Sequence, residues 1–272
     1  MIDNHVHIGQ FANIYYEPNV IFTTVFEAGI DELFFSSTTT CKDNIRYVEV
    51  EKEISNSLLQ IGSMAGKTHP LLWYKPDYKK QGISIEKAMC NLPYCGIKIH
   101  PFAHDWDINN TIVVDLLHSL FDYAHRNEVP ILVHTGVDSC CEANKFIPFY
   151  AKYTKAQCIL AHGRPLKQTI SLLNKFMNVY CDTAFMPLKD FKCIIDNELG
   201  NKVIIGSDFP ITHYYSFKYG NASFKNNFVE LKNQYRNDIE TMKYYELLLT
   251  NGAFLGGKIT PKICDAPNIV QL

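Results

Sequence analysis

The sequence predicts an α/β protein, a (β/α)8 TIM barrel formed by residues 1–272 as one domain. Short apolar segments alternate eight times with segments of helical periodicity, which is the pattern of βα repeats. The length of 272 residues is typical of a single barrel of this kind. The alternative architecture, a doubly wound sheet, would bind a nucleotide through a glycine-rich turn after its first strand, and no such turn follows Ile8.

The predicted strands are short runs rich in Val, Ile, Leu and Phe, as expected for strands buried on both faces of a parallel sheet. They lie at residues 2–8, 33–35, 70–74, 96–101, 130–136, 158–163, 178–182 and 203–208. The segments between them are predicted to be helical. Helices are expected before Gly29, at 43–61, 85–91, 111–127 and 145–153, after Pro165, and at 190–199, around Val229 and at 242–254, with a long loop after Pro210.

The first nine residues carry the most informative polar pattern. Alternate side chains of a strand lie on one face, so we expect Asp3, His5 and His7 to share a face. Two adjacent imidazoles can bind a transition metal through their neutral nitrogens. A single His-x-His pair is equally compatible with hydrogen-bonded histidines in a protein core, so the other strands must decide between the two.

Titratable side chains recur where the later predicted strands end. These residues are Lys98, His100, His134, His162 and Asp208. The C-terminal ends of barrel strands meet at one rim, where the active sites of such barrels lie. Burying several of these groups without partners would cost several kcal/mol, so packing alone does not explain them. A common site at this rim is therefore predicted.

The set of motifs resembles the amidohydrolase superfamily, specifically its amidohydrolase-related branch, which also contains metal-dependent decarboxylases and hydratases. The resemblance extends over the whole chain. It is carried by the segments Asp3–His7, Gly96–Pro101, Leu132–Gly136, Leu160–Gly163, Gly206–Pro210 and Asn251–Ala253. The TatD-like nuclease branch is less similar, because it would have a glutamate in place of Lys98.

The resemblance implies a metal site formed by His5, His7, His134 and Asp208. For His162 it implies either ligation of a second ion or the orientation of water and substrate. In binuclear relatives a lysine at the position of Lys98 is carbamylated and bridges two ions, whereas in relatives with one ion the residue there only contacts substrate or structure. We favour one divalent ion, because an ammonium group beside a cation needs neutralisation. Zinc is the expected metal, and manganese, iron and cobalt also suit these ligands.

The implied reaction is hydrolysis of an amide, ester or lactone in a small molecule by a metal-activated water. Asp208 would act as general base and then as general acid, and His162 would stabilise the developing oxyanion. Lys98, His100 and Arg164 are expected to contact the substrate, although Arg164 could equally lie in solvent at a helix start. The alternatives are a lyase that decarboxylates or hydrates its substrate, and a barrel that retains a metal only to bind a ligand or to stabilise its fold.

The bulk composition argues against several kinds of partner. The formal net charge of -2 gives no basic field that would attract nucleic acid or an anionic membrane. Nine cysteines without zinc-finger spacing predict reduced thiols. No leader sequence or membrane-length apolar run is recognisable, so a cytoplasmic protein is expected. The aromatic residues between 214 and 219 could contact a substrate or a second subunit, and the sequence is compatible with a homodimer.

Overall fold

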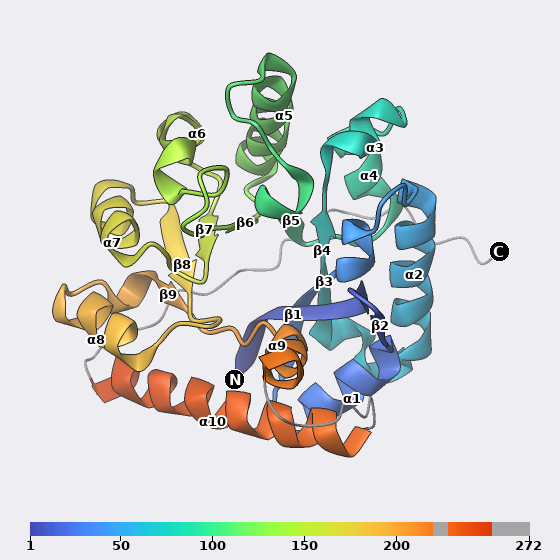
Figure 1. The fold of residues 1–272 in the computed structure, drawn as a ribbon, viewed down its shortest axis with the longest axis vertical. Helices are drawn as coiled ribbons and strands as arrows, with labels where there is room; N and C mark the ends of the chain where they lie inside the picture. Colours follow the sequence, from blue (N-terminus) through green and yellow to red (C-terminus); the bar gives the residue numbers. More distant parts are fainter. Residues whose placement is uncertain (220–227, 252–272) are drawn as a thin grey trace.

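The computed structural model describes residues 1–219 and 228–251, and it confirms the α/β barrel fold (Figure 1). The strands are β1 (Ile2–Phe11), β2 (Ile14–Tyr16), β3 (Glu32–Ser37), β4 (Thr68–Trp73), β5 (Gly96–Ile99), β6 (Ile131–His134), β7 (Cys158–Ala161), β8 (Val179–Asp182) and β9 (Val203–Ile204). The helices are α1 (Pro18–Glu27), α2 (Tyr47–Gln60), α3 (Pro76–Lys80), α4 (Ile85–Asn91), α5 (Thr111–Asn127), α6 (Ile147–Lys152), α7 (Leu166–Lys175), α8 (Leu188–Asp196), α9 (Ile211–Tyr219) and α10 (Phe228–Asn251). Figure 1 shows the helices arranged around the strands, with α10 extending from α8 to α1.

The strands are ordered as a barrel requires. Strand β1 and strands β3 to β9 are parallel neighbours in sequence order, and β2 adds to β1 as an antiparallel hairpin. The segment after β9 returns to β1 through backbone hydrogen bonds, from Asn4 N–H to Ile205 O at 3.1 Å and from Asp208 N–H to His5 O at 2.7 Å. A Cβ at Gly206 would lie 2.9 Å from the Cβ of His5, so a glycine is needed for this close approach. The first and last strands are thereby joined.

The interior of the barrel divides into an apolar and a polar part. Side chains from β3, β4, β6, β7 and β9, together with the residue just before β5, form a small buried cluster, separate from the larger core beneath the helices. Its members are Phe34, Leu71, Cys95, Leu132, Ile159, Ala161 and Ile204. Since parallel strands bring equivalent positions into layers, this cluster fills the N-terminal part of the barrel. The polar residues of the candidate metal centre, described below, occupy the C-terminal part of the barrel.

The face predicted for Asp3 is wrong. The register between β1 and β3 shifts between Asp3 and Val6, and such an irregularity places the residues on its two sides on different faces. His5 and His7 therefore point into the barrel, whereas Asp3 accepts a hydrogen bond from the hydroxyl of Tyr235 in α10. The carboxylate of Asp3 lies behind the histidine pair and not beside it.

Other differences from the sequence predictions concern the C-terminal third. Residues 211–219 form helix α9 where a loop was expected, and α10 is one helix of 24 residues instead of two segments. The buried residues of α10 recur every three or four positions, as in an amphipathic helix. They are Leu231, Tyr235, Ile239, Met242, Tyr245 and Leu249. Residues 252–254 of the expected closing helix lie outside the described part of the chain.

Within residues 1–219 and 228–251, every cysteine is a free thiol, as expected for reduced cysteines, while Cys264 lies outside the described residues. None of the helices in these same stretches combines the length and the apolar character that crossing a membrane would require.

Candidate metal centre

Two histidine nitrogens and one carboxylate oxygen converge at the C-terminal ends of the strands. The Nε2 atoms of His5 and His7 lie 3.2 Å apart, and Asp208 Oδ1 lies 3.1 Å from the first and 2.9 Å from the second. All three residues are buried, and their ligand atoms form one of two described groups compact enough to hold a metal ion. The convergence predicted for His5, His7 and Asp208 is therefore present.

The second ring nitrogen, Nδ1, of His5 and of His7 forms a hydrogen bond with another group. His5 Nδ1 lies 2.7 Å from Asp182 Oδ2, and His7 Nδ1 lies 3.3 Å from the carbonyl oxygen of Ser36. A carboxylate only accepts hydrogen bonds, so His5 Nδ1 carries the proton and His5 Nε2 keeps its lone pair in the neutral ring. His7 Nδ1 also lies 3.1 Å from the hydroxyl of Ser36, which can donate or accept, and its contact with the carbonyl oxygen is the one that requires a proton on Nδ1. Such second contacts are typical of metal-binding histidines, because they fix the tautomer and orient the ring.

The protonation states leave three electron-rich atoms facing one another. Burial lowers the pKa of His7 to about 4, so this ring is neutral at neutral pH. Burial alone would raise the pKa of Asp208, but a proton shared with His7 and charge interactions with the protonated forms of His5, His162 and His7 outweigh it and hold that pKa below its ordinary range. Two lone pairs and one carboxylate oxygen within 3.2 Å repel one another unless a proton or cation lies between them. The donor set thus suits a divalent ion.

Asp182 is a buried residue of this site that was not singled out from the sequence. Its Oδ1 accepts hydrogen bonds from the backbone N–H of His162 at 2.7 Å and of Ala184 at 3.1 Å, while its Oδ2 accepts from His5. Burial alone would raise the pKa of Asp182, but His5 lowers it below its ordinary value, so the carboxylate is ionised. Asp182 ends β8, and the strand-end pattern that indicated the other residues also applies to it.

Lys98 lies among the candidate ligands. Its Nζ is 2.8 Å from His5 Nε2 and 5.6 Å from the centre of the Trp73 ring. The side chain is buried, and burial lowers the pKa of its ammonium group, although the nearby Asp208 and Asp182 carboxylates oppose this shift. A metal ion at His5 Nε2 would compete with the ammonium group for the same lone pair. Lys98 therefore contacts the candidate metal ligands directly.

The predicted ligand His134 lies beside His162 and is not a member of either described ligand group. His162 Nδ1 donates to the carbonyl oxygen of Ala184 at 3.1 Å, which leaves its Nε2 to accept from His134 Nδ1 at 3.1 Å. His134 also stacks on His100, with ring centroids 3.6 Å apart. Burial lowers the pKa of His162 to about 4, so the His162 ring is neutral at neutral pH. That His134 binds the metal stays a prediction, and His162 belongs to the second group, with His5 and Asp182.

A cavity of about 90 Å³ opens beside these residues. It is lined by polar groups from the site and by aromatic side chains, namely His7, Lys98, His100, His134, His162, Arg164 and Asp208 with Phe11, Trp73, Phe185 and Tyr215. The exposed Arg164 borders the cavity and donates from Nε to the carbonyl oxygen of Thr135 at 3.4 Å. All three predicted substrate-binding residues therefore face one cavity next to the ligand group.

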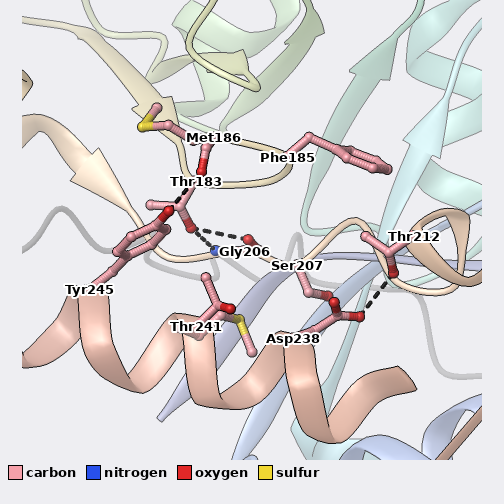
Figure 2. A pocket seen from close by; sticks show the side chains of 10 residues that line it. Thr183, Phe185, Met186, Gly206, Ser207, Thr212, Asp238, Thr241 and Tyr245 are labelled. Atoms are coloured by element: carbon pink, nitrogen blue, oxygen red, sulfur yellow. Dashed lines mark hydrogen bonds between the residues drawn. The ribbon is translucent and has the colours of Figure 1, made fainter. Parts of the chain in front are cut away.

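A second cavity, of about 210 Å³, lies between the ends of β8 and β9 and helix α10 (Figure 2). Asp238 of α10 borders it and accepts a hydrogen bond from the hydroxyl of Thr212 at 2.8 Å. Thr183 and Tyr245 border it as well, and Tyr245 donates its hydroxyl proton to the carbonyl oxygen of Met186 at 2.6 Å. This cavity is separate from the one that the candidate ligands border.

We expect Asp238→Asn to stabilise the protein more at pH 8 than at pH 5. Burial raises the pKa of Asp238 to about 7, whereas an aspartate in an unfolded chain has a pKa of about 3.9. The folded state therefore holds this proton more tightly, and stability falls as the pH rises from about 4 through 7. The advantage of the variant in the free energy of unfolding should grow by ~2 kcal/mol between the two pH values, measured by urea denaturation. An equal advantage at both pH values would contradict the shifted pKa.

Comparison with known proteins supports the fold. No protein-family model matches the sequence, and a comparison with curated proteins finds no match. A TIM-barrel protein from Bordetella bronchiseptica aligns with a TM-score of 0.55 and 12% identity, covering 90% of this chain and 98% of its own. A probable 2-pyrone-4,6-dicarboxylic acid hydrolase from Acinetobacter baumannii, with citric acid bound, aligns with a TM-score of 0.53 and 12% identity, covering 93% and 99%. A dihydroxybenzoic acid decarboxylase from Polaromonas, with bound manganese and an inhibitor, gives 0.51 and 10%, again covering 93% and 99%. At these identities the similarity is one of fold.

Proposed function

We propose that the protein is a metal-dependent enzyme of the amidohydrolase superfamily that hydrolyses an amide, ester or lactone in a small molecule. The observation that carries the proposal is the meeting of His5 Nε2, His7 Nε2 and Asp208 Oδ1 within 3.2 Å, with both Nδ1 atoms held by other groups. The neighbouring cavity of about 90 Å³ favours a small substrate over a polymer. Zinc is the metal we expect, and the manganese found in one structural neighbour makes that ion the first alternative.

Each residue has a definite task in this proposal. A bound divalent ion would supply Lewis acidity and lower the pKa of a water molecule. Asp208, ionised at neutral pH, would accept the proton of the attacking water and return it to the leaving group. His134 and His162 share a proton between Nδ1 and Nε2, so they would act together on the charge that develops on the substrate. Arg164 would orient a substrate carboxylate at the cavity entrance.

A decarboxylase is the second candidate, and the composition of the cavity favours it. The aromatic rings of Trp73, Phe185 and Tyr215 border the same space as the cationic groups of Lys98 and Arg164. Such a cavity suits a planar acid, which would stack on the rings and pair its carboxylate with the cations. The manganese-containing structural neighbour is itself a decarboxylase.

Metal analysis and turnover assays test the proposal. We expect purified protein to contain a divalent metal, to lose activity after chelation and to regain it when the metal is restored. A panel of lactones, amides, esters and aromatic acids should be assayed in ¹⁸O-labelled water. Incorporation of the label supports the hydrolase, whereas release of CO₂ without incorporation supports the decarboxylase. Turnover that is unaffected by metal removal would refute both.

The variant Lys98→Met tests the number of ions. We expect wild-type protein to bind a single ion, because an ammonium group 2.8 Å from His5 Nε2 would repel a second cation unless it were neutralised or carbamylated. The variant should then keep the metal content of the wild type, measured by elemental analysis, since it removes only a group that competes for His5 Nε2. A fall from two ions to one or none in the variant would show that Lys98 is a carbamylated ligand.

A further inference from the structure

Asp3 connects the two chain segments that carry the candidate metal ligands. Its carboxylate is fully buried and contacts helix α10. Oδ1 accepts hydrogen bonds from the backbone N–H of His5 at 3.1 Å and of Ser207 at 3.0 Å. Oδ2 accepts from the hydroxyl of Ser207 at 2.6 Å and from that of Tyr235 at 2.8 Å. One side chain thus binds the backbone of His5, a candidate ligand, and of Ser207, the residue before the candidate ligand Asp208.

The segment around Asp208 needs such support, because its backbone is unusual. Asp208 has a φ of +64°, in the left-handed region that residues other than glycine seldom adopt. The hydroxyl of Ser207 also accepts a hydrogen bond from the N–H of Phe209 at 3.0 Å. Ser207 therefore fixes the chain on both sides of Asp208, and Asp3 fixes Ser207.

Helix α10 contributes the last contact through Tyr235. This tyrosine is fully buried, and its hydroxyl group reaches from α10 to Asp3 in β1. Ten residues further along the same helix, Tyr245 is also buried, but its hydroxyl binds the carbonyl oxygen of Met186 at the second cavity (Figure 2). Both tyrosines lie in α10 and donate a buried hydroxyl proton. Of the two hydroxyl groups, that of Tyr235 bonds to Asp3 and that of Tyr245 bonds to Met186.

We propose that Asp3, Ser207 and Tyr235 form a brace that positions His5 and Asp208 and thereby sets the affinity of the site for its metal ion. The inference rests on the proposed function, since it needs a metal at these ligands. The brace acts through the main chain. Asp3 fixes the backbone at His5 and Ser207, and this in turn fixes the positions of the His5 and Asp208 side chains. None of the three residues touches the ion, so they are positioning residues.

The zinc dissociation constant measures the effect directly. It should be determined by competition with a chromogenic chelator for the wild type, Asp3→Asn, Tyr235→Phe and the control Tyr245→Phe. An amide at position 3 cannot accept from all four donors, so we expect Asp3→Asn to raise Kd roughly 10- to 100-fold, the usual effect of removing a group that orients a ligand. Tyr235→Phe removes one contact of the brace and should raise Kd less than Asp3→Asn. Tyr245→Phe should leave Kd unchanged.

Melting temperatures of the apo proteins complete the experiment. Both tyrosine variants lose one buried hydroxyl contact, so their Tm values should fall by similar amounts while only Tyr235→Phe weakens zinc binding. Equal Kd values in the two tyrosine variants would overturn the brace, and this comparison decides the matter even if Asp3→Asn fails to fold. Wild-type protein that binds neither zinc nor manganese would overturn the proposed function, and the brace with it.

Discussion

Asp208→Asn is expected to lower kcat/KM by about 10³-fold or more, because it removes both a ligand charge and the group that accepts and returns the proton. The substitution preserves the volume of the side chain and places a neutral amide within about 3 Å of His5 Nε2 and His7 Nε2. Loss of the carboxylate charge should also weaken metal binding. Steady-state kinetics with the substrate identified by the panel, together with the zinc Kd, would measure both effects.

Asp238→Asn is the matched control for this experiment. Asp238 is another largely buried aspartate near the same end of the barrel, but it borders the second cavity and contacts Thr212. Its replacement should change stability and leave kcat/KM close to the wild-type value. If Asp208→Asn retained wild-type turnover, the carboxylate could not be the acid and base of the reaction.

Asp182→Asn is expected to weaken zinc binding by about 100-fold, although Asp182 need not touch the ion. The new amide can still accept from the N–H groups of His162 and Ala184 through its oxygen. Its NH₂ group would then face the Nδ1 proton of His5, and two donors cannot bond to each other. His5 would have to move its proton to Nε2, which removes the lone pair that faces His7 and Asp208.

Nitrogen NMR of the imidazole rings would report this change of tautomer directly. In the wild-type apo protein the His5 proton should reside on Nδ1, and in Asp182→Asn it should reside on Nε2. Zinc affinity equal to that of the wild type, with the proton still on Nδ1, would show that Asp182 does not control the ring of His5.

The position of barrel active sites at the C-terminal ends of the strands explains which parts of the site could be predicted. Parallel strands bring their C-terminal ends together, so the positions of His5, His7, His162 and Asp208 followed from the predicted strands alone. Asp182 also ends a strand, but as a single aspartate it lacks the paired histidines that mark β1 in the sequence. Its role depends on a contact with His5, 177 residues away in the sequence, which no local pattern records.

The remaining differences have non-local causes. The placement of Asp3 depends on an irregular register between β1 and β3, and register is a property of the pair of strands and not of either sequence. Helix α9 is rich in tyrosine and begins with Ile211 and Thr212, residues of modest helix propensity, so tertiary contacts decide its structure. The resemblance implied that His134 is a ligand, and this stays a prediction, because the contact with His162 involves only its Nδ1 atom.

The junction between β1 and the segment after β9 has a consequence for biosynthesis. Asn4 and Ile205, which bond across it, are 201 positions apart, so the histidine pair leaves the ribosome long before Asp208 is synthesised. Contacts of such large sequence separation form late, because the entropy of closing the intervening chain must be overcome first. If the site binds a metal as proposed, a newly made chain can therefore complete that site only after Asp208 has left the ribosome.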